Sequence, residues 1–166
     1  MQRKRKAWFS VKVLFVSAAL VLADQVSKRI VVSTMSLYES IPIVENFLHF
    51  TYITNDGMAF GINFPFGYFV FTTVSILLTV FLLWYLWSLK DHPIVPRLGL
   101  ALIIAGAFGN LIDRIFLGEV IDFLDFMIGD YHWYVFNLAD SYVTIGMIMV
   151  LIDNIFFEKK REQPSA

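Results

Sequence analysis

The chain has 166 residues and a net charge of −1, and its composition is that of a membrane protein. Hydrophobic residues make up 58% and charged residues 16%, against about 45–50% and about 25% in soluble domains. There is no cysteine, which excludes disulfides, thiolate nucleophiles and iron–sulfur clusters. The histidines are far apart and no glycine-rich phosphate loop occurs, so we expect no metal, no cofactor and no bound nucleic acid.

Four apolar runs of membrane length predict four transmembrane helices, at about 20 residues per crossing. The first run, Ala7–Ala23, contains a single charge, Lys12, near its start, and the second, Tyr68–Trp87, contains none. With no internal repeat or low-complexity segment, residues 1–166 are expected to form one domain. The predicted helices cover residues 8–29, 68–88, 97–116 and 136–157.

The basic residues predict the orientation of these helices. Nine of the 13 Lys and Arg residues fall on one side of a four-helix arrangement, and only Lys28, Arg29 and Arg114 fall on the other. The positive-inside rule therefore places both termini in the cytoplasm. The nine are Arg3, Lys4, Arg5, Lys6, Lys90, Arg97, Lys159, Lys160 and Arg161.

Two outer segments connect the helices. Within residues 31–66, the β-favouring stretch Phe47–Thr54 predicts a strand of a small sheet. The turn-rich aromatic stretch that follows, up to Phe66, predicts an interfacial segment lying on the membrane. The second connection, residues 118–134, is short and carries Asp122. We expect an all-α membrane bundle of four transmembrane helices with a small non-cytoplasmic β-sheet and an interfacial segment.

Two aspartates, Asp122 and Asp140, lie beside membrane-length apolar runs. A carboxylate at the centre of a bilayer helix costs roughly 2.5–3.5 kcal/mol, so such residues tend to face a protein interior or a watery cavity. Two carboxylates that share one site can divide acid and base work between them. The sequence therefore predicts an acid–base pair of Asp122 and Asp140.

The third helix carries polar residues toward its outer end. Asn110, Asp113 and Arg114 are spaced to lie on one face. An alternative is that Asp113 and Arg114 only form an ion pair at the helix end. Small residues at four-residue spacing predict a close approach to another helix, and Gly106 widens this stripe of Ala101, Ala105 and Gly109.

On the fourth helix, Asn137, Asp140, Ser141 and Thr144 share a face. The alternative here is a local one, in which Asn137 caps the helix and Asp140 complements its dipole.

Three further polar features lie outside these two helices. Asp24 and Lys28 form an i, i+4 pair of favourable order, which a structural salt bridge would also explain. Asn55 begins a predicted turn. Asp125 is predicted to be a solvated neighbour of Asp122.

Five motifs, in order along the chain, resemble those of lipoprotein signal peptidase (signal peptidase II), a family of bacterial intramembrane aspartyl proteases. Two positions depart from the family pattern. Ala105 stands where the family often has a glycine, and Met58 stands where it commonly has alanine. The motifs are Asp24–Lys28, Asn55–Gly61, Gly106–Arg114, Gly118–Phe123 and Phe136–Ser141.

The resemblance implies a substrate, a reaction and a location. The implied substrate is a prolipoprotein whose cysteine already carries diacylglycerol, cut just before that cysteine by a water that Asp122 and Asp140 activate. The enzyme would lie in the bacterial cytoplasmic (inner) membrane, with its site near the outer face, and would be inhibited by globomycin-type compounds. We expect a monomer in contact with membrane lipid. The implied supporting residues are Asp24, Lys28, Asn55, Asn110, Asp113, Arg114 and Asn137.

Three other classes compete with this hypothesis. A small transporter or channel would need polar residues along a whole helix face, whereas the charges here cluster at one end of the helices. A membrane scaffold would tolerate the loss of any single charge. A Ser/Lys protease would use Ser141, or Ser27, with Lys28, although packing within the helix explains Ser141 better.

Overall fold

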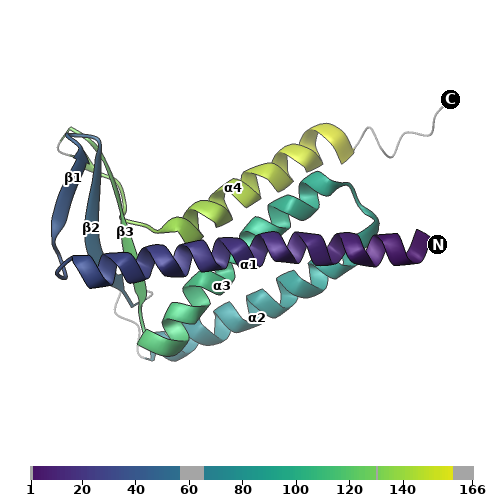
Figure 1. Cartoon of the computed structure of the whole chain (residues 1–166), viewed down its shortest axis with the longest axis horizontal. Coiled ribbons are helices and arrows are strands. Elements are labelled where there is room, and N and C mark those ends of the chain that lie inside the picture. Colours follow the sequence, from purple (N-terminus) through teal and green to yellow (C-terminus); the bar gives the residue numbers. More distant parts are fainter. Residues whose placement is uncertain (1, 57–65, 130, 159–166) are drawn as a thin grey trace.

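The computed structural model describes residues 2–56, 66–129 and 131–158 and shows long helices with a sheet across one end (Figure 1). The start of α1 and the end of α4 lie at the opposite end from the sheet. The helices are α1 (Gln2–Thr34), α2 (Gly67–Ser88), α3 (Ile94–Leu117) and α4 (Leu138–Asp153), the last continued by a π-helical turn, Asn154–Glu158. The strands are β1 (Ser40–Val44), β2 (Leu48–Asn55), β3 (Val120–Ile128) and β4 (Tyr131–His132).

Three of the described helical segments are long and apolar enough to cross a membrane: residues 67–91, 94–117 and 138–157. They correspond to the second, third and fourth predicted crossings, within a few residues at each end. The first predicted crossing, 8–29, lies inside α1, a continuous helix of 33 residues. Because α1 is not one of the three, a fourth transmembrane helix stays a prediction.

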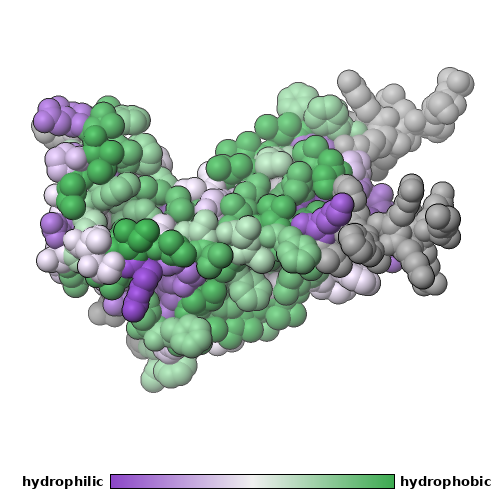
Figure 2. Space-filling view, in the orientation of Figure 1, coloured by the Kyte–Doolittle hydropathy of each residue, from purple (hydrophilic) through white to green (hydrophobic). Residues whose placement is uncertain are grey.

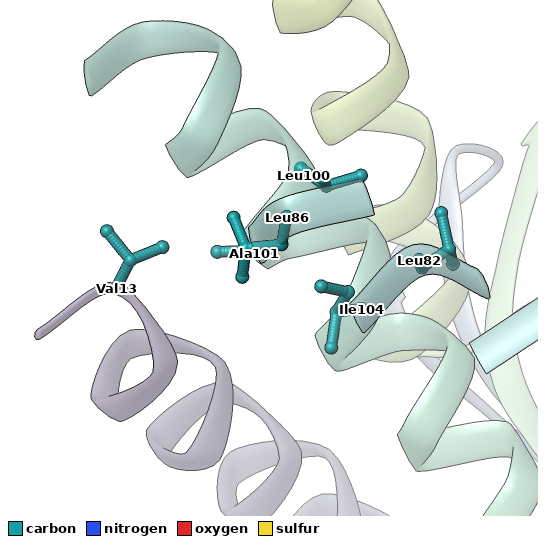
Figure 3. Close-up of a cluster of buried hydrophobic side chains, with 6 residues drawn as sticks. All are labelled: Val13, Leu82, Leu86, Leu100, Ala101 and Ile104. Atoms are coloured by element: carbon teal, nitrogen blue, oxygen red, sulfur yellow. The ribbon is translucent and has the colours of Figure 1, made fainter. Parts of the chain in front are cut away.

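The surface of the helices is largely apolar, as expected for a protein whose solvent is lipid (Figure 2). On α2, Phe81 and Trp84 are more than half exposed. The interior holds a compact apolar cluster that joins α1, α2 and α3 (Figure 3). Its members are Val13, Leu82, Leu86, Leu100, Ala101 and Ile104.

Small residues bring α3 and α4 into close contact, as the sequence predicts. A Cβ atom added at Gly106 would overlap the backbone carbonyl oxygen of Ala139 in α4. One added at Gly109 would lie 2.6 Å from Oδ2 of Asp24 in α1. These glycines therefore set how near the first turn of α4 and the polar part of α1 come to α3.

The four strands form one antiparallel sheet in the order β1-β2-β3-β4. β2 confirms the strand predicted at Phe47–Thr54. The sequence left the conformation of residues 118–134 open, and this connection contains the nine-residue strand β3 and its short partner β4. β3 pairs with β2 along much of its length, and Asp122 lies opposite Ile53. Most of the predicted interfacial segment, residues 57–65, lies outside the described residues.

Two local features fix β3 on the helices. Gly118 ends α3 with φ 85°, a left-handed conformation that glycine adopts without strain, and β3 begins two residues later. Phe123 of β3 then packs with Val31 and Met35 near the end of α1. The sheet is thereby held against the C-terminal ends of α1 and α3, where the polar residues of the predicted site lie.

Candidate active site

Asp140 lies in the first turn of α4 and takes part in two separate interactions. Its backbone N–H donates to Oδ1 of Asn137 (3.0 Å), and its Oδ2 accepts from the backbone N–H of Asn137 (3.2 Å). This is a capping box, so the local alternative for these residues is confirmed. Its other oxygen, Oδ1, accepts a 2.7 Å hydrogen bond from Nδ2 of Asn110 on α3. Asp140 therefore caps α4 and also joins a network across the bundle.

Asp122, near the start of β3, belongs to the same network. Its Oδ1 accepts from Nδ2 of Asn137 (2.6 Å), and its Oδ2 accepts from Nδ2 of Asn55 at the end of β2 (3.3 Å). Asn137 is fully buried and bonds to both aspartates. The structure thus brings Asp122 and Asp140 together around one asparagine, although they come from a strand and a helix.

Burial and, to a smaller extent, the negative charge of Asp140 together raise the pKa of Asp122 to about 7. The hydrogen bonds from Asn55 and Asn137, and the charge of Lys28, act in the opposite direction. A carboxyl group with a pKa near neutrality exists in both protonation states at the working pH. Such a group can donate and accept a proton within one reaction cycle.

Lys28 holds the polar cluster together from the other side. Its side chain is only 1% exposed, and Nζ lies 3.0 Å from Oδ2 of Asp24 and 2.7 Å from Oδ2 of Asp113. Nζ also donates to Oδ1 of Asn110 (3.0 Å), so each of its N–H groups has an acceptor. Asp113 is paired with Lys28 and not, as the simpler alternative supposed, with Arg114. A buried ammonium with full hydrogen bonding can be accommodated away from water.

The carboxylates that bind Lys28 also tie the surrounding elements together. Oδ1 of Asp24 accepts from the backbone N–H of Ala139, which attaches α1 to the first turn of α4 (3.0 Å). Oδ2 of Asp113 accepts from the backbone N–H of Ile121, which attaches α3 to β3 (3.3 Å). The strand that carries Asp122 and the helix that carries Asp140 are therefore each hydrogen-bonded to a carboxylate that pairs with Lys28.

Gln25 is a member of this network that the sequence did not single out. Its Nε2 donates to Oδ1 of Asp113 (2.9 Å) and to the carbonyl oxygen of Gly109 (3.1 Å). Gln25 follows Asp24 in the first motif, and this position was the one indication of its role. An uncharged amide is common on helix surfaces, so its residue type did not indicate a buried network.

Arg114 lies at the edge of the site. Nη1 donates to the carbonyl oxygen of Asn110 (3.3 Å), while Nε has no hydrogen-bond partner among the described residues. Its positive charge interacts with Asp140 and Asp122. Arg114 therefore supplies positive charge beside the aspartates without a direct ion pair to either of them in the described part of the chain.

Asp125 corrects the prediction of a solvated residue. Its side chain is 2% exposed, accepts a 2.8 Å hydrogen bond from Oγ1 of Thr51 and lies 3.0 Å from Nδ1 of His132. The prediction was wrong because the sequence did not indicate that Asp125 lies within a strand. Within the sheet, the neighbouring strands cover Asp125 and supply its partners.

The serine alternative receives no geometric support. Oγ of Ser141 donates to the carbonyl oxygen of Asn137 (3.1 Å), and Oγ of Ser27 donates to that of Asp24 (2.7 Å). Both serines therefore bond within their own helices, whereas a Ser/Lys protease needs a hydroxyl bound to the lysine amine.

A cavity of about 410 Å³ opens beside Asp140. One wall is the polar face of α4, which carries Ser141 and Thr144, and the other includes the aromatic residues Trp133 and Tyr134.

The fold and the site define an integral membrane protein whose acidic, amide-rich cluster lies at one end of its helices. The model of the family described as "Signal peptidase (SPase) II" matches residues 16–156. The chain therefore belongs to the signal peptidase II family, and it is a peptidase of the bacterial inner membrane.

Individual relatives agree with this family along nearly the whole chain. A lipoprotein signal peptidase of Desulforapulum autotrophicum is 43% identical over 154 residues, covering 90% of this chain and 94% of the relative. That of Clostridioides difficile is 46% identical over 142 residues, covering 85% and 93%. A solved structure of a bacterial membrane enzyme, 30% identical, superposes with a TM-score of 0.75 and covers 93% of each chain.

Proposed function

We propose that this chain is an aspartic endopeptidase that cuts diacylglyceryl-modified prolipoproteins just before the lipidated cysteine. The observation that carries the proposal is the joining of Asp122 and Asp140 through Asn137, which bonds to both carboxyl groups. Family membership supports the substrate class. Because both aspartates belong to one chain, a monomer is sufficient for activity.

In the proposed reaction, a water molecule between the aspartates attacks the scissile carbonyl carbon. We assign the general base, which takes a proton from this water, to Asp140, because Asp122, with its pKa raised to about 7, is the carboxyl group that keeps a proton. Protonated Asp122 gives its proton to the carbonyl oxygen, which forms a tetrahedral diol. General acid–base steps of this kind typically contribute about 10²–10⁴-fold each.

The diol then collapses and the products separate. The C–N bond breaks as Asp140 returns its proton to the leaving amine of the lipidated cysteine. One diol hydroxyl gives its proton back to Asp122, leaving a carboxyl group on the released signal peptide. No covalent intermediate with the enzyme forms, and the pair returns to its starting protonation state.

The remaining residues would position the substrate and the pair. Asn55 and Asn110 orient the aspartates through their amides, and Arg114 places positive charge where the tetrahedral oxygen forms. The signal peptide would lie in the cavity beside Asp140, with the acyl chains of the substrate in the lipid. A globomycin-type lipopeptide would compete for the same place.

The proposal is tested by replacing each aspartate with asparagine, which keeps the shape but removes the acid–base function. Asp122→Asn and Asp140→Asn should each reduce cleavage of a lipidated prolipoprotein by at least about 10²-fold. Asp125→Asn is a matched control, because Asp125 is buried in the same strand and should leave cleavage close to wild type. Near-normal turnover by either of the first two purified variants would refute the aspartic mechanism.

A further inference from the structure

A second cavity, of about 390 Å³, lies between the C-terminal ends of α1 and α3 and the sheet. It is separate from the proposed active site, since neither Asp122 nor Asp140 lines it. The alternation of β3 explains the separation. Ile121 contributes to this cavity while the next residue, Asp122, points to the opposite face of the strand. The reaction proposed above makes no use of this cavity.

Two of the four charged residues that line this cavity, Arg29 and Glu119, lie outside the ion pairs of Lys28. Lys28 and Asp113 also line the cavity, but they are paired with each other and Lys28 has three acceptors. Arg29 and Glu119 remain, and neither forms an ion pair within the part of the chain that the structure describes. Glu119 and Tyr52 line the same cavity. Burial, and then the charge of Glu119, raise the pKa of the Tyr52 hydroxyl.

The remaining wall is apolar and open to the lipid. Val32, Ile112, Phe116 and Leu117 line it, and Phe116 is 79% exposed. Phe116 and Leu117 are in the last turn of α3, one of the segments able to cross a membrane. The cavity is therefore lined by apolar residues at the end of α3 and by two charged side chains, Arg29 and Glu119.

We infer that this cavity binds a phospholipid whose headgroup carries a phosphate and a primary amine, of the phosphatidylethanolamine class. Arg29 would bind the phosphate, for which a guanidinium is well shaped, and Glu119 would accept N–H hydrogen bonds from the ammonium. The acyl chains would lie along Phe116 and Leu117. A choline headgroup has no N–H to donate, and a glycerol headgroup offers Glu119 no cation. The diacylglyceryl group of the substrate has neither phosphate nor amine.

Native mass spectrometry of the full chain, with equal amounts of phosphatidylethanolamine, phosphatidylcholine and phosphatidylglycerol, tests this inference. The wild type should retain about ten times more of the ethanolamine lipid than of the choline lipid. A tenfold difference in affinity is about what one hydrogen bond to a charged group contributes. Glu119→Gln should abolish that preference, whereas Arg29→Ala should weaken retention of all three lipids. Glu45→Gln and Lys90→Ala, which change exposed charges elsewhere, are the matched controls and should bind as the wild type does.

A third variant guards against misfolding of the first two. Val32→Trp keeps both charges but fills the cavity, so it should also lose the bound lipid. Equal retention of the three lipids by the wild type would overturn the inference. Loss of bound phosphatidylethanolamine on adding a diacylglyceryl peptide would overturn it too, because the cavity would then belong to the substrate. Since lipid retention is measured without cleavage, the result is independent of the aspartic mechanism.

Discussion

Among the single residues of the proposed site, Asn137 is the one that donates a hydrogen bond to each of the two aspartates. Its side chain donates to Asp122 and its backbone N–H donates to Asp140. Because Asp122 is buried and the negative charge of Asp140 acts on it, the ionised form of Asp122 is disfavoured. A pair that retains one proton near neutral pH is what the proposed reaction requires.

The raised pKa of Asp122 predicts how activity depends on pH. A carboxyl group with a pKa of about 7 is protonated below that pH and ionised above it. Since the proposed reaction needs protonated Asp122, turnover should fall as the pH rises through about 7. Initial rates on a lipidated substrate between pH 5 and 9 measure this. A rate that keeps rising to pH 9 would contradict the assignment.

Lys28 is predicted to matter for stability because it forms ion pairs with two buried carboxylates. Lys28→Met would leave Asp24 and Asp113 buried without their partner, at a cost of about 3–5 kcal/mol. A thermal melt in detergent should show a clear fall in Tm. The exposed Lys90 provides the control, since Lys90→Met should shift Tm far less.

At the scale of elements, the contact of α3 with α4 sets the position of Asp140. Gly106→Val would push a side chain into the backbone of Ala139, next to Asp140. The hydrogen bond from Asn110 to Asp140 should then lengthen, so both activity and Tm should fall. Ala18→Val, which adds volume on an exposed part of α1, serves as the comparison for both measurements. Unchanged cleavage by Gly106→Val would show that the pair tolerates movement of α4.

The helices were predictable from the sequence, whereas β3 was not. Long apolar runs separated by charges indicate α2, α3 and α4 directly. β3 has an almost continuous apolar pattern, Val-Ile-Asp-Phe-Leu-Asp-Phe-Met-Ile, which does not alternate because most of its residues are buried. Its main partner, β2, is also distant in the sequence. The strand that carries Asp122 was therefore not predicted from the sequence.

The residues of the site also divide into those that the sequence indicated and those that it did not. Charged residues in an apolar chain stand out, so Asp24, Lys28 and Asp113 could be selected, and the structure brings them together. Their partners could not be assigned, because pairing depends on how the helices cross. Gln25 was missed for a similar reason, since only the packed structure places its amide against Asp113.

At the scale of the whole molecule, the predicted orientation puts the sheet outside the cell and both termini inside. The chain contains no cysteine, so single cysteines report their own location. In intact spheroplasts, a membrane-impermeant maleimide should label Ile43→Cys in β1 but not His92→Cys, which follows α2. Permeabilised cells, in which both should react, provide the control.

The same labelling decides whether α1 crosses the membrane. Lys4→Cys, ahead of the first apolar run, should react only after permeabilisation, because α1 would separate it from Ile43. Reaction of both positions in intact spheroplasts would place the two ends of α1 on one side. The four-helix topology would then be wrong.

Asp140 lies on α4, which follows α1, α2 and α3 in the described part of the chain, and this order bears on when a newly made chain gains its activity. A nascent polypeptide that has inserted α1, α2 and α3 already carries Asp122, but it lacks Asn137 and the second carboxyl group. Under the proposed mechanism, it cannot hydrolyse any peptide while it is still being translated. Under the proposed mechanism, proteolysis in the membrane therefore starts only after the first turn of α4 has been made and has packed against α3.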